Sequence, residues 1–172
     1  MKVVTLERNF PASSDDGARA AIVILRAPSA RKAILAGGLA AGCFDLFTAF
    51  LTFGWGVPRA IAAGLLGRGA FQGGLATYFL GVALHFFIAL SAAAIYYSAG
   101  RRLAFLKEHW LVSGLFYGVG VFLVMNLVVL PLSALHSRGP YELAGLIRGL
   151  LVHMVLIGLP IAFSVRRFSG NA

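Results

Sequence analysis

Charge is scarce in this chain, and acidic charge is scarcest. Only 12% of the 172 residues are charged and six are acidic, whereas about 25% of the residues of a soluble domain are charged. This excludes an ordinary soluble globular fold for most of the chain. The sequence also lacks an H-E-x-x-H metal motif, a paired-carboxylate motif and a glycine-rich phosphate loop. These absences argue against enzymatic chemistry.

Cysteine is nearly absent as well. The single cysteine, Cys43, lies inside an apolar stretch, so an internal disulfide and a cysteine-based metal motif are excluded.

A cleavable signal peptide is not expected either. The first thirty residues contain Glu7, Asp15 and Asp16, and their only apolar run, 21–25, is too short for the hydrophobic region of such a peptide. We expect the first apolar stretch to act as an uncleaved insertion signal.

The chain does have four long apolar stretches. It is 59% hydrophobic, with a mean hydropathy of +0.86, and a membrane-spanning helix needs about 20 mostly apolar residues. Four segments reach that length, at about 33–53, 75–98, 111–135 and 143–165. We therefore predict an all-α integral membrane protein, with a four-helix transmembrane domain over 31–168 that follows a polar arm over residues 1–30.

The connections between these stretches predict their arrangement. The second and third are short, so sequential helices are expected to be antiparallel neighbours in an up-down bundle. The first, 54–74, is longer than a tight turn requires. Pro58 suits the first turn of a helix and Gly67 suits its end, which predicts a short interfacial helix between the first two spans. Arg59 and Arg68 bracket this helix, either to contact lipid phosphate or as part of a lid over a site within the bundle.

The net charge of +9 is distributed unevenly. Eleven of the 15 basic residues lie before the first span, in the second connection or after the last span, and four lie on the other side. This positive-inside pattern predicts that both termini are cytoplasmic and that the lipid bilayer is the main partner. A nucleic-acid interface would need a basic face interleaved with aromatic residues on a soluble domain, and none is present.

Each apolar stretch carries one strongly polar residue near its middle: Asp45, His85, Asn126 and His153. An ionised group at this depth costs about 2.5 kcal/mol or more, so such residues are expected to face the bundle interior and to find partners there. At 1.5 Å per residue, all four fit in a slab about 5–8 Å thick. They could therefore form one network.

Helical periodicity places three of the four on faces of small residues. These faces hold Gly38, Ala41 and Gly42 for Asp45, then Tyr78, Gly81, Ala89 and Ala92 for His85, and Gly145 and Gly149 for His153. Gly38 and Gly42 form a G-x-x-x-G pair, which lets another helix backbone approach closely. We expect Asp45, His85 and His153 to converge. Asn126 lies about 80° away from the row of Gly114 and Gly118 and is expected to brace the bundle.

The leading functional hypothesis is a small transporter or accessory subunit with a polar core. Asp45 with His85 or His153 could relay protons or coordinate a cation, with the two histidines as metal ligands. The structural alternative is a network in which Asp45 accepts a hydrogen bond from an imidazole N–H. Association with further subunits, through the glycine-rich helix faces, is compatible with either hypothesis.

Two other hypotheses remain open. Axial ligation by His85 and His153 would make this a b-type haem protein, with the small-residue faces leaving room for the macrocycle; purified protein without a Soret band would end that hypothesis. A membrane enzyme acting on a lipid or quinone ranks last, for want of a catalytic motif.

The last two spans share a short sequence pattern, which is a weak internal repeat. Met125 precedes Leu130-Pro131 as Met154 precedes Leu159-Pro160. The prolines are expected to bend their helices and to free backbone carbonyls, which then need partners or water.

A glycine-rich first helix with an intramembrane acid (Gly38 to Asp45), a Pro58-Arg59 pair and a later His85 together give a family resemblance. Over residues 33 to 167 the chain resembles the YagU-like group of uncharacterised bacterial inner-membrane proteins. The resemblance implies a bacterial inner-membrane location and about four spans, and it implies no established activity.

Overall fold

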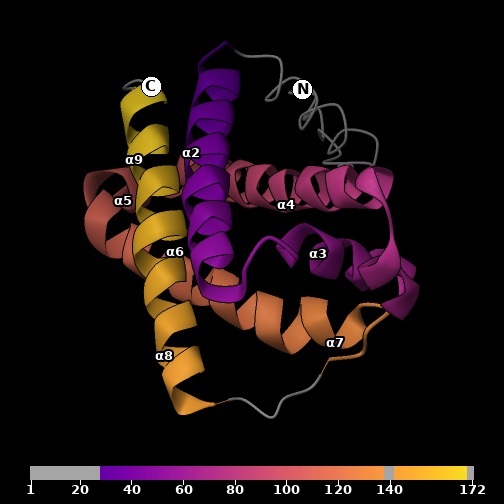
Figure 1. The fold of residues 1–172 in the computed structure, drawn as a ribbon. Helices are drawn as coiled ribbons and strands as arrows, with labels where there is room; N and C mark the ends of the chain where they lie inside the picture. Colours follow the sequence, from indigo (N-terminus) through magenta and orange to yellow (C-terminus); the bar gives the residue numbers. More distant parts are fainter. Residues whose placement is uncertain (1–27, 138–141, 170–172) are drawn as a thin grey trace, which may run out of the picture.

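Four helical columns form the body of the protein (Figure 1). The structure is a computed structural model that describes residues 28–137 and 142–169. The columns are α2 (Pro28–Phe53), α4 (Leu75–Arg102), α6–η2–α7 (Trp110–Val124, Met125–Val129, Leu130–Leu132) and α8–η3–α9 (Leu143–Val152, His153–Gly158, Leu159–Phe168). Each is long and apolar enough to cross a membrane. The protein is therefore a multi-pass membrane protein, as predicted, while the predicted polar arm lies almost wholly outside the described residues.

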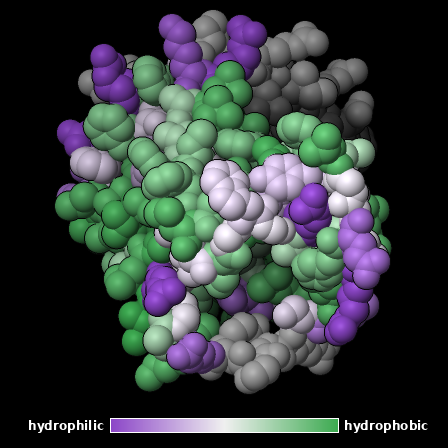
Figure 2. Space-filling view, in the orientation of Figure 1, coloured by the Kyte–Doolittle hydropathy of each residue, from purple (hydrophilic) through white to green (hydrophobic). Residues whose placement is uncertain are grey.

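The columns pack as two antiparallel pairs, and in Figure 1 the pair of α2 and α8–η3–α9 lies across the pair of α4 and α6–η2–α7. In Figure 1, α2 and α8–η3–α9 run side by side, and α2 begins at the end where α9 finishes. Behind them lie α4 and α6–η2–α7, joined by α5 (Phe105–Glu108). We call the part of the molecule where α2 begins and where α4 and α9 end the basic end; these helix ends and α5 carry Arg31, Lys32, Arg101, Arg102, Lys107, Arg166 and Arg167. Figure 2 shows hydrophilic surface at the top, and also along the right edge and at the lower left, with hydrophobic surface over the helices between them.

The predicted short helix between the first two spans is present as α3 (Val57–Leu66), and it packs into the bundle. Figure 1 shows it between α4 and α7. Pro58 lies against Gly81 of α4, where a Cβ would collide with the Pro58 carbonyl. On the other side, the Gly64 carbonyl accepts a 2.7 Å hydrogen bond from the Ala134 N–H. Ala62 is fully buried. We call this end of the bundle, with η1 (Arg68–Gln72), the α3 end.

Helices α4 and α6 meet towards the basic end and separate towards the α3 end. They meet through Tyr96 and Tyr117, whose ring centroids lie 4.8 Å apart. The Tyr117 hydroxyl donates a 2.7 Å hydrogen bond to the Ala92 carbonyl. The largest fully buried side chains besides Pro58 are Tyr96, Ile161 and Val165, which lie in this half of the bundle. Helix α3 occupies the space where α4 and α6 diverge.

Glycines set the closest helix approaches. A Cβ on Gly38 would lie 2.9 Å from the Leu90 Cα, and one on Gly42 would lie 2.9 Å from the Phe86 ring, which confirms the close approach predicted from the G-x-x-x-G pair. On α6, a Cβ on Gly118 would collide with the backbone of His153. Gly145 differs, because nothing lies within 4 Å of its Cβ position. The row predicted on the last span therefore packs inward only in part.

The two proline-containing spans both widen into a π-helix. The segments η2 and η3 end just before Leu130-Pro131 and Leu159-Pro160. Proline has no N–H to donate, and its ring collides with the carbonyl of the residue four positions earlier, so the preceding turn opens to the wider π geometry. The sequence pattern that the last two spans share therefore corresponds to a π-helix that occurs in both of them.

The α6–η3 contact gives a stability prediction. Gly118→Ala should lower the thermal unfolding midpoint in detergent, because the added methyl group meets the η3 backbone and such overpacking costs about 1–3 kcal/mol. Gly120→Ala is the matched control on the same helix, since its Cβ position is open, and it should leave the midpoint unchanged or slightly higher. Circular dichroism measures both, and equal midpoints would contradict the packing.

Candidate functional site

Three of the four midspan polar residues line one cavity. Asp45, His85 and His153 surround a space of about 90 Å³ in the middle of the bundle. Its other walls are Ala41, Gly42, Ile61, Ile88, Ala89, Ala92, Val121, Met125 and Ile157. We call this space the polar cavity. It brings a carboxylate and two imidazoles together from three helical columns, within a mainly apolar lining.

His85 is held by the backbone of α2. Its Nε2–H donates a 2.9 Å hydrogen bond to the Gly42 carbonyl, because a carbonyl can only accept. In the neutral ring this leaves Nδ1 as the nitrogen that can take up a proton. The bond forms because Gly42 has no side chain to separate the two helices. The same packing that brings α2 and α4 together therefore orients this imidazole.

His153 is held within its own helix, at the first residue of η3. Its Nδ1–H donates a 2.8 Å hydrogen bond to the Gly149 carbonyl. The Phe122 ring meets the imidazole edge to face, with centroids 5.4 Å apart. In this ring Nε2 is the nitrogen left to accept a proton. The two histidines thus use opposite ring nitrogens for their anchoring bonds.

Asp45 takes no part in these anchoring bonds. The structural hypothesis placed its carboxylate as the acceptor of an imidazole N–H, and that is wrong for the described part of the chain, where both imidazole N–H groups donate to backbone carbonyls. The reason is local, because a helix carbonyl lies within reach of each ring. Asp45 is half-buried and lines a second space as well as the polar cavity.

That second space is a groove between α2 and α8. It measures about 260 Å³ and is lined by Asp45, Thr48, Ala49, Thr52, Phe53, Glu142, Ala144, Gly145, Arg148, Gly149, Val152 and His153. Asp45 and His153 belong to both spaces. We call it the α2–α8 groove. Figure 2 shows a hollow below the end of α2, on the α3-end half of the molecule.

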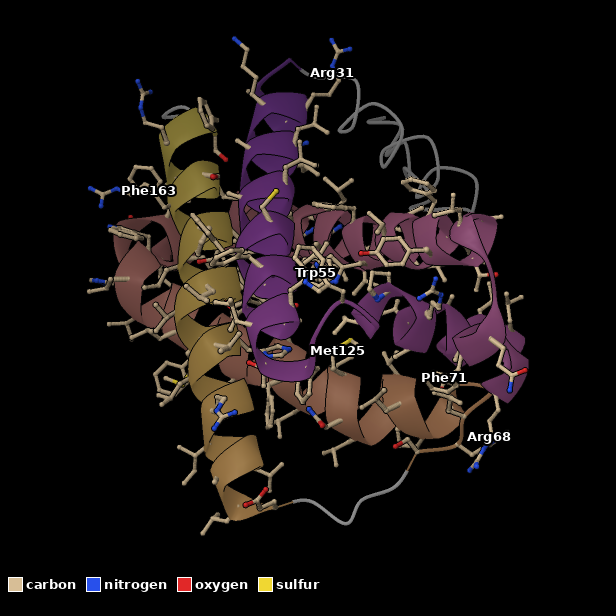
Figure 3. All side chains as sticks on the ribbon, in the orientation of Figure 1. Arg31, Trp55, Arg68, Phe71, Met125 and Phe163 are labelled. Carbon is tan, nitrogen blue, oxygen red and sulfur yellow. The ribbon has the colours of Figure 1, made fainter. Side chains whose placement is uncertain are left out.

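The remaining predicted site residues lie elsewhere. Asn126 is not among the residues that line the polar cavity, and its Nδ2 donates to the Phe122 carbonyl at 2.8 Å. Arg59 fastens α3 to the start of α4, since its Nε donates to the Gly73 carbonyl at 2.8 Å and its guanidinium lies over the Tyr78 ring. Arg68 is exposed and, in Figure 3, points away from the bundle.

Several cavity residues were not assigned to a site by sequence reasoning, among them Ile61 and Met125. Ile61 of α3 supplies part of the wall, so the short helix reaches the cavity through an apolar side chain and not through its arginines. Met125, labelled in Figure 3, begins η2 and contributes another part. Met125 and His153 are the first residues of the two π-helices, and both line the cavity.

The metal-ligand and haem-ligand roles of His85 and His153 stay predictions. The described residues contain no group of three or more His, Cys, Asp or Glu side chains close enough to hold a metal ion. The polar cavity measures about 90 Å³, whereas sites for ligands of drug size measure about 300–1,000 Å³. In addition, the His85 Nε2 is engaged with the Gly42 carbonyl.

A larger hollow lies away from the three polar residues. It measures about 580 Å³, lies between α4, α5 and α6 near the basic end, and has a mainly apolar and aromatic lining that includes Phe105, Val112 and Phe116 together with His109 and Ser113. Tyr96 and Tyr117 line it too, and Tyr117 is bonded to Ala92, a wall residue of the polar cavity. The tyrosine pair therefore lies between the two spaces.

No family model, no curated protein and no solved structure matches this chain. The resemblance to the YagU-like group stays a prediction, and the chemistry of the site has to be argued from its own residues.

The His85 anchor can be tested by stability. Glutamine places an amide nitrogen near the position of the imidazole Nε2, so His85→Gln should keep the bond to Gly42. His85→Ala loses it and leaves empty space, at a cost of about 1–3 kcal/mol. Thermal unfolding in detergent should therefore rank wild type and His85→Gln well above His85→Ala. An equally low midpoint for both variants would show that this bond does not orient the ring.

Proposed function

We propose that this multi-pass membrane protein is a small transporter, or the membrane subunit of one, in which Asp45, His85 and His153 relay protons through the polar cavity. One observation supports the proposal: these three residues line the same cavity, and each of the two imidazoles is anchored through one nitrogen to a backbone carbonyl. An anchored neutral imidazole has a fixed N–H and one nitrogen that can accept a proton. Such a ring takes up and passes on a proton without leaving its place.

Asp45 gives the relay its counter-charge. When an imidazole accepts a proton it becomes a cation, and a cation surrounded by apolar side chains is costly unless an anion lies nearby. Asp45 lines the same cavity and supplies that anion. A space of about 90 Å³ with polar groups on its wall holds water molecules, which bridge proton transfer between groups that do not bond directly.

The orientation follows from charge. Basic residues gather at the basic end, and loops rich in Lys and Arg stay on the cytoplasmic side of a bacterial inner membrane. In this proposal the basic end and both termini are cytoplasmic, and the α3 end faces the opposite side. The glycine-rich faces pack within this chain at Gly38, Gly42 and Gly118, whereas Gly145 is open, and a partner subunit would associate through such an open position.

Proton flux tests the proposal. Purified protein in liposomes with an internal pH-sensitive dye should acidify the interior when valinomycin and a potassium gradient impose an inside-negative potential. Asp45→Asn should slow this flux about tenfold or more, since proton-transfer groups typically contribute factors of about 10² to 10⁴. Glu108→Gln is the matched control, because Glu108 is exposed on α5, far from the cavity in the fold, and its flux should equal that of wild type.

Two histidine variants separate relay from structure. His85→Gln and His153→Asn keep the amide N–H at the anchoring position and remove the second ring nitrogen. Both should fold as wild type and lose flux. Wild-type flux no faster than that of empty liposomes, or undiminished flux in Asp45→Asn, would refute the relay.

A further inference from the structure

The α2–α8 groove has the composition of a water path. Along α2 it is lined by Asp45, Thr48, Ala49, Thr52 and Phe53, which share one helix face by their spacing of three and four. The Thr48 and Thr52 hydroxyls donate to the carbonyls four residues earlier, at 2.9 Å each. Their hydrogens are thus used by the helix, and their oxygens remain as acceptors along the groove. Water and hydrated protons are the species that such acceptors suit.

The wall of the groove that α8 forms carries charged side chains within or next to the membrane-spanning segment. Arg148 lies five residues from His153, about 7.5 Å along the helix, and it lines the groove with Glu142. Charged side chains within apolar spans face water-filled spaces or partners, because lipid does not solvate them. Gly145 keeps this wall open, since nothing lies within 4 Å of its Cβ position. The groove therefore offers the charged residues the aqueous surroundings that they need.

The opposite side of the polar cavity is closed. Its walls towards the basic end are Ala41, Ala92 and Ile157, all buried. Behind them the Tyr117 hydroxyl donates a hydrogen bond to the Ala92 carbonyl, and the Tyr117 ring meets edge to face the ring of Tyr96, of which only 1% is exposed. The apolar core around Ile161 lies in the same half. The hollow beyond the tyrosine pair shares no lining residue with the polar cavity, whereas the α2–α8 groove shares Asp45 and His153 with it.

We infer that the α2–α8 groove is the water-filled entrance through which protons reach Asp45 and His153 from the α3 end, and that the Tyr96–Tyr117 pair closes the cavity towards the basic end. The groove and the cavity share these two titratable residues, so a proton that enters the groove meets them first. The identity of the travelling species depends on the proposed function, whereas the path itself can be tested without it.

Cysteine labelling tests the path. In a Cys43→Ser background, which removes the only cysteine, single cysteines are placed in the groove (Thr48→Cys, Thr52→Cys) and at adjacent exposed positions on the apolar surface of α2 (Phe47→Cys, Leu51→Cys). A charged, membrane-impermeant methanethiosulfonate is then added to vesicles from either side. Thiols react as thiolates, which form in water and not in lipid, so each groove cysteine should react about tenfold faster or more than its neighbour.

Sidedness comes from two exposed reference positions. Gly69→Cys marks the α3 end and Ser98→Cys marks the basic end. The groove cysteines should be labelled from the same side as Gly69→Cys. Groove cysteines that react no faster than their neighbours, or that react from the side of Ser98→Cys, would overturn the inference.

Labelling and flux together separate the two proposals. Labelling of Thr52→Cys should also block proton flux in the liposome assay. The expected labelling without any flux in wild type would refute the relay and leave the entrance established. Flux without groove labelling would leave the relay standing and refute the entrance.

Discussion

The hydrogen bond from His85 to the Gly42 carbonyl is the interaction on which the polar site depends. It exists because Gly38 and Gly42 let α4 lie against the α2 backbone, so that a carbonyl is exposed to the ring. The close contact between α2 and α4 therefore also orients the His85 imidazole. A side chain at Gly42 would move α4 away, and with it the His85 imidazole that lines the cavity. The packing of α2 against α4 therefore also determines the geometry of the polar site.

Much of the fold was predictable, because a membrane imposes strong rules. The length of apolar runs fixed the number of spans, and the short connections fixed their antiparallel order. Glycine spacing identified where α2 and α4 meet. Periodicity also placed Asp45, His85 and His153 on inward faces, and these three line the polar cavity. These predictions succeeded because each depends on spacing within one helix.

The remaining features depend on contacts between helices, which spacing does not reveal. The anchoring of both imidazoles to backbone carbonyls, in place of a bond to Asp45, follows from which carbonyl lies nearest in the packed bundle. The role of Ile61 follows from the insertion of α3 between α4 and α7. The π-helices had a signal in the repeated Met-to-Pro spacing, yet only the structure shows that their first residues, Met125 and His153, both line the cavity.

The central claim is that two oppositely anchored imidazoles exchange protons in one hydrated cavity. Nitrogen-15 NMR of histidine-labelled protein in liposomes addresses it most directly, in a variant that lacks His109 and His136 so that His85 and His153 alone give signals. The account predicts one ring protonated at Nε2 and one at Nδ1 in alkaline buffer, and uptake of a second proton by both when the buffer is acidified. Two rings in the same tautomer, or rings that take up no proton, would contradict it.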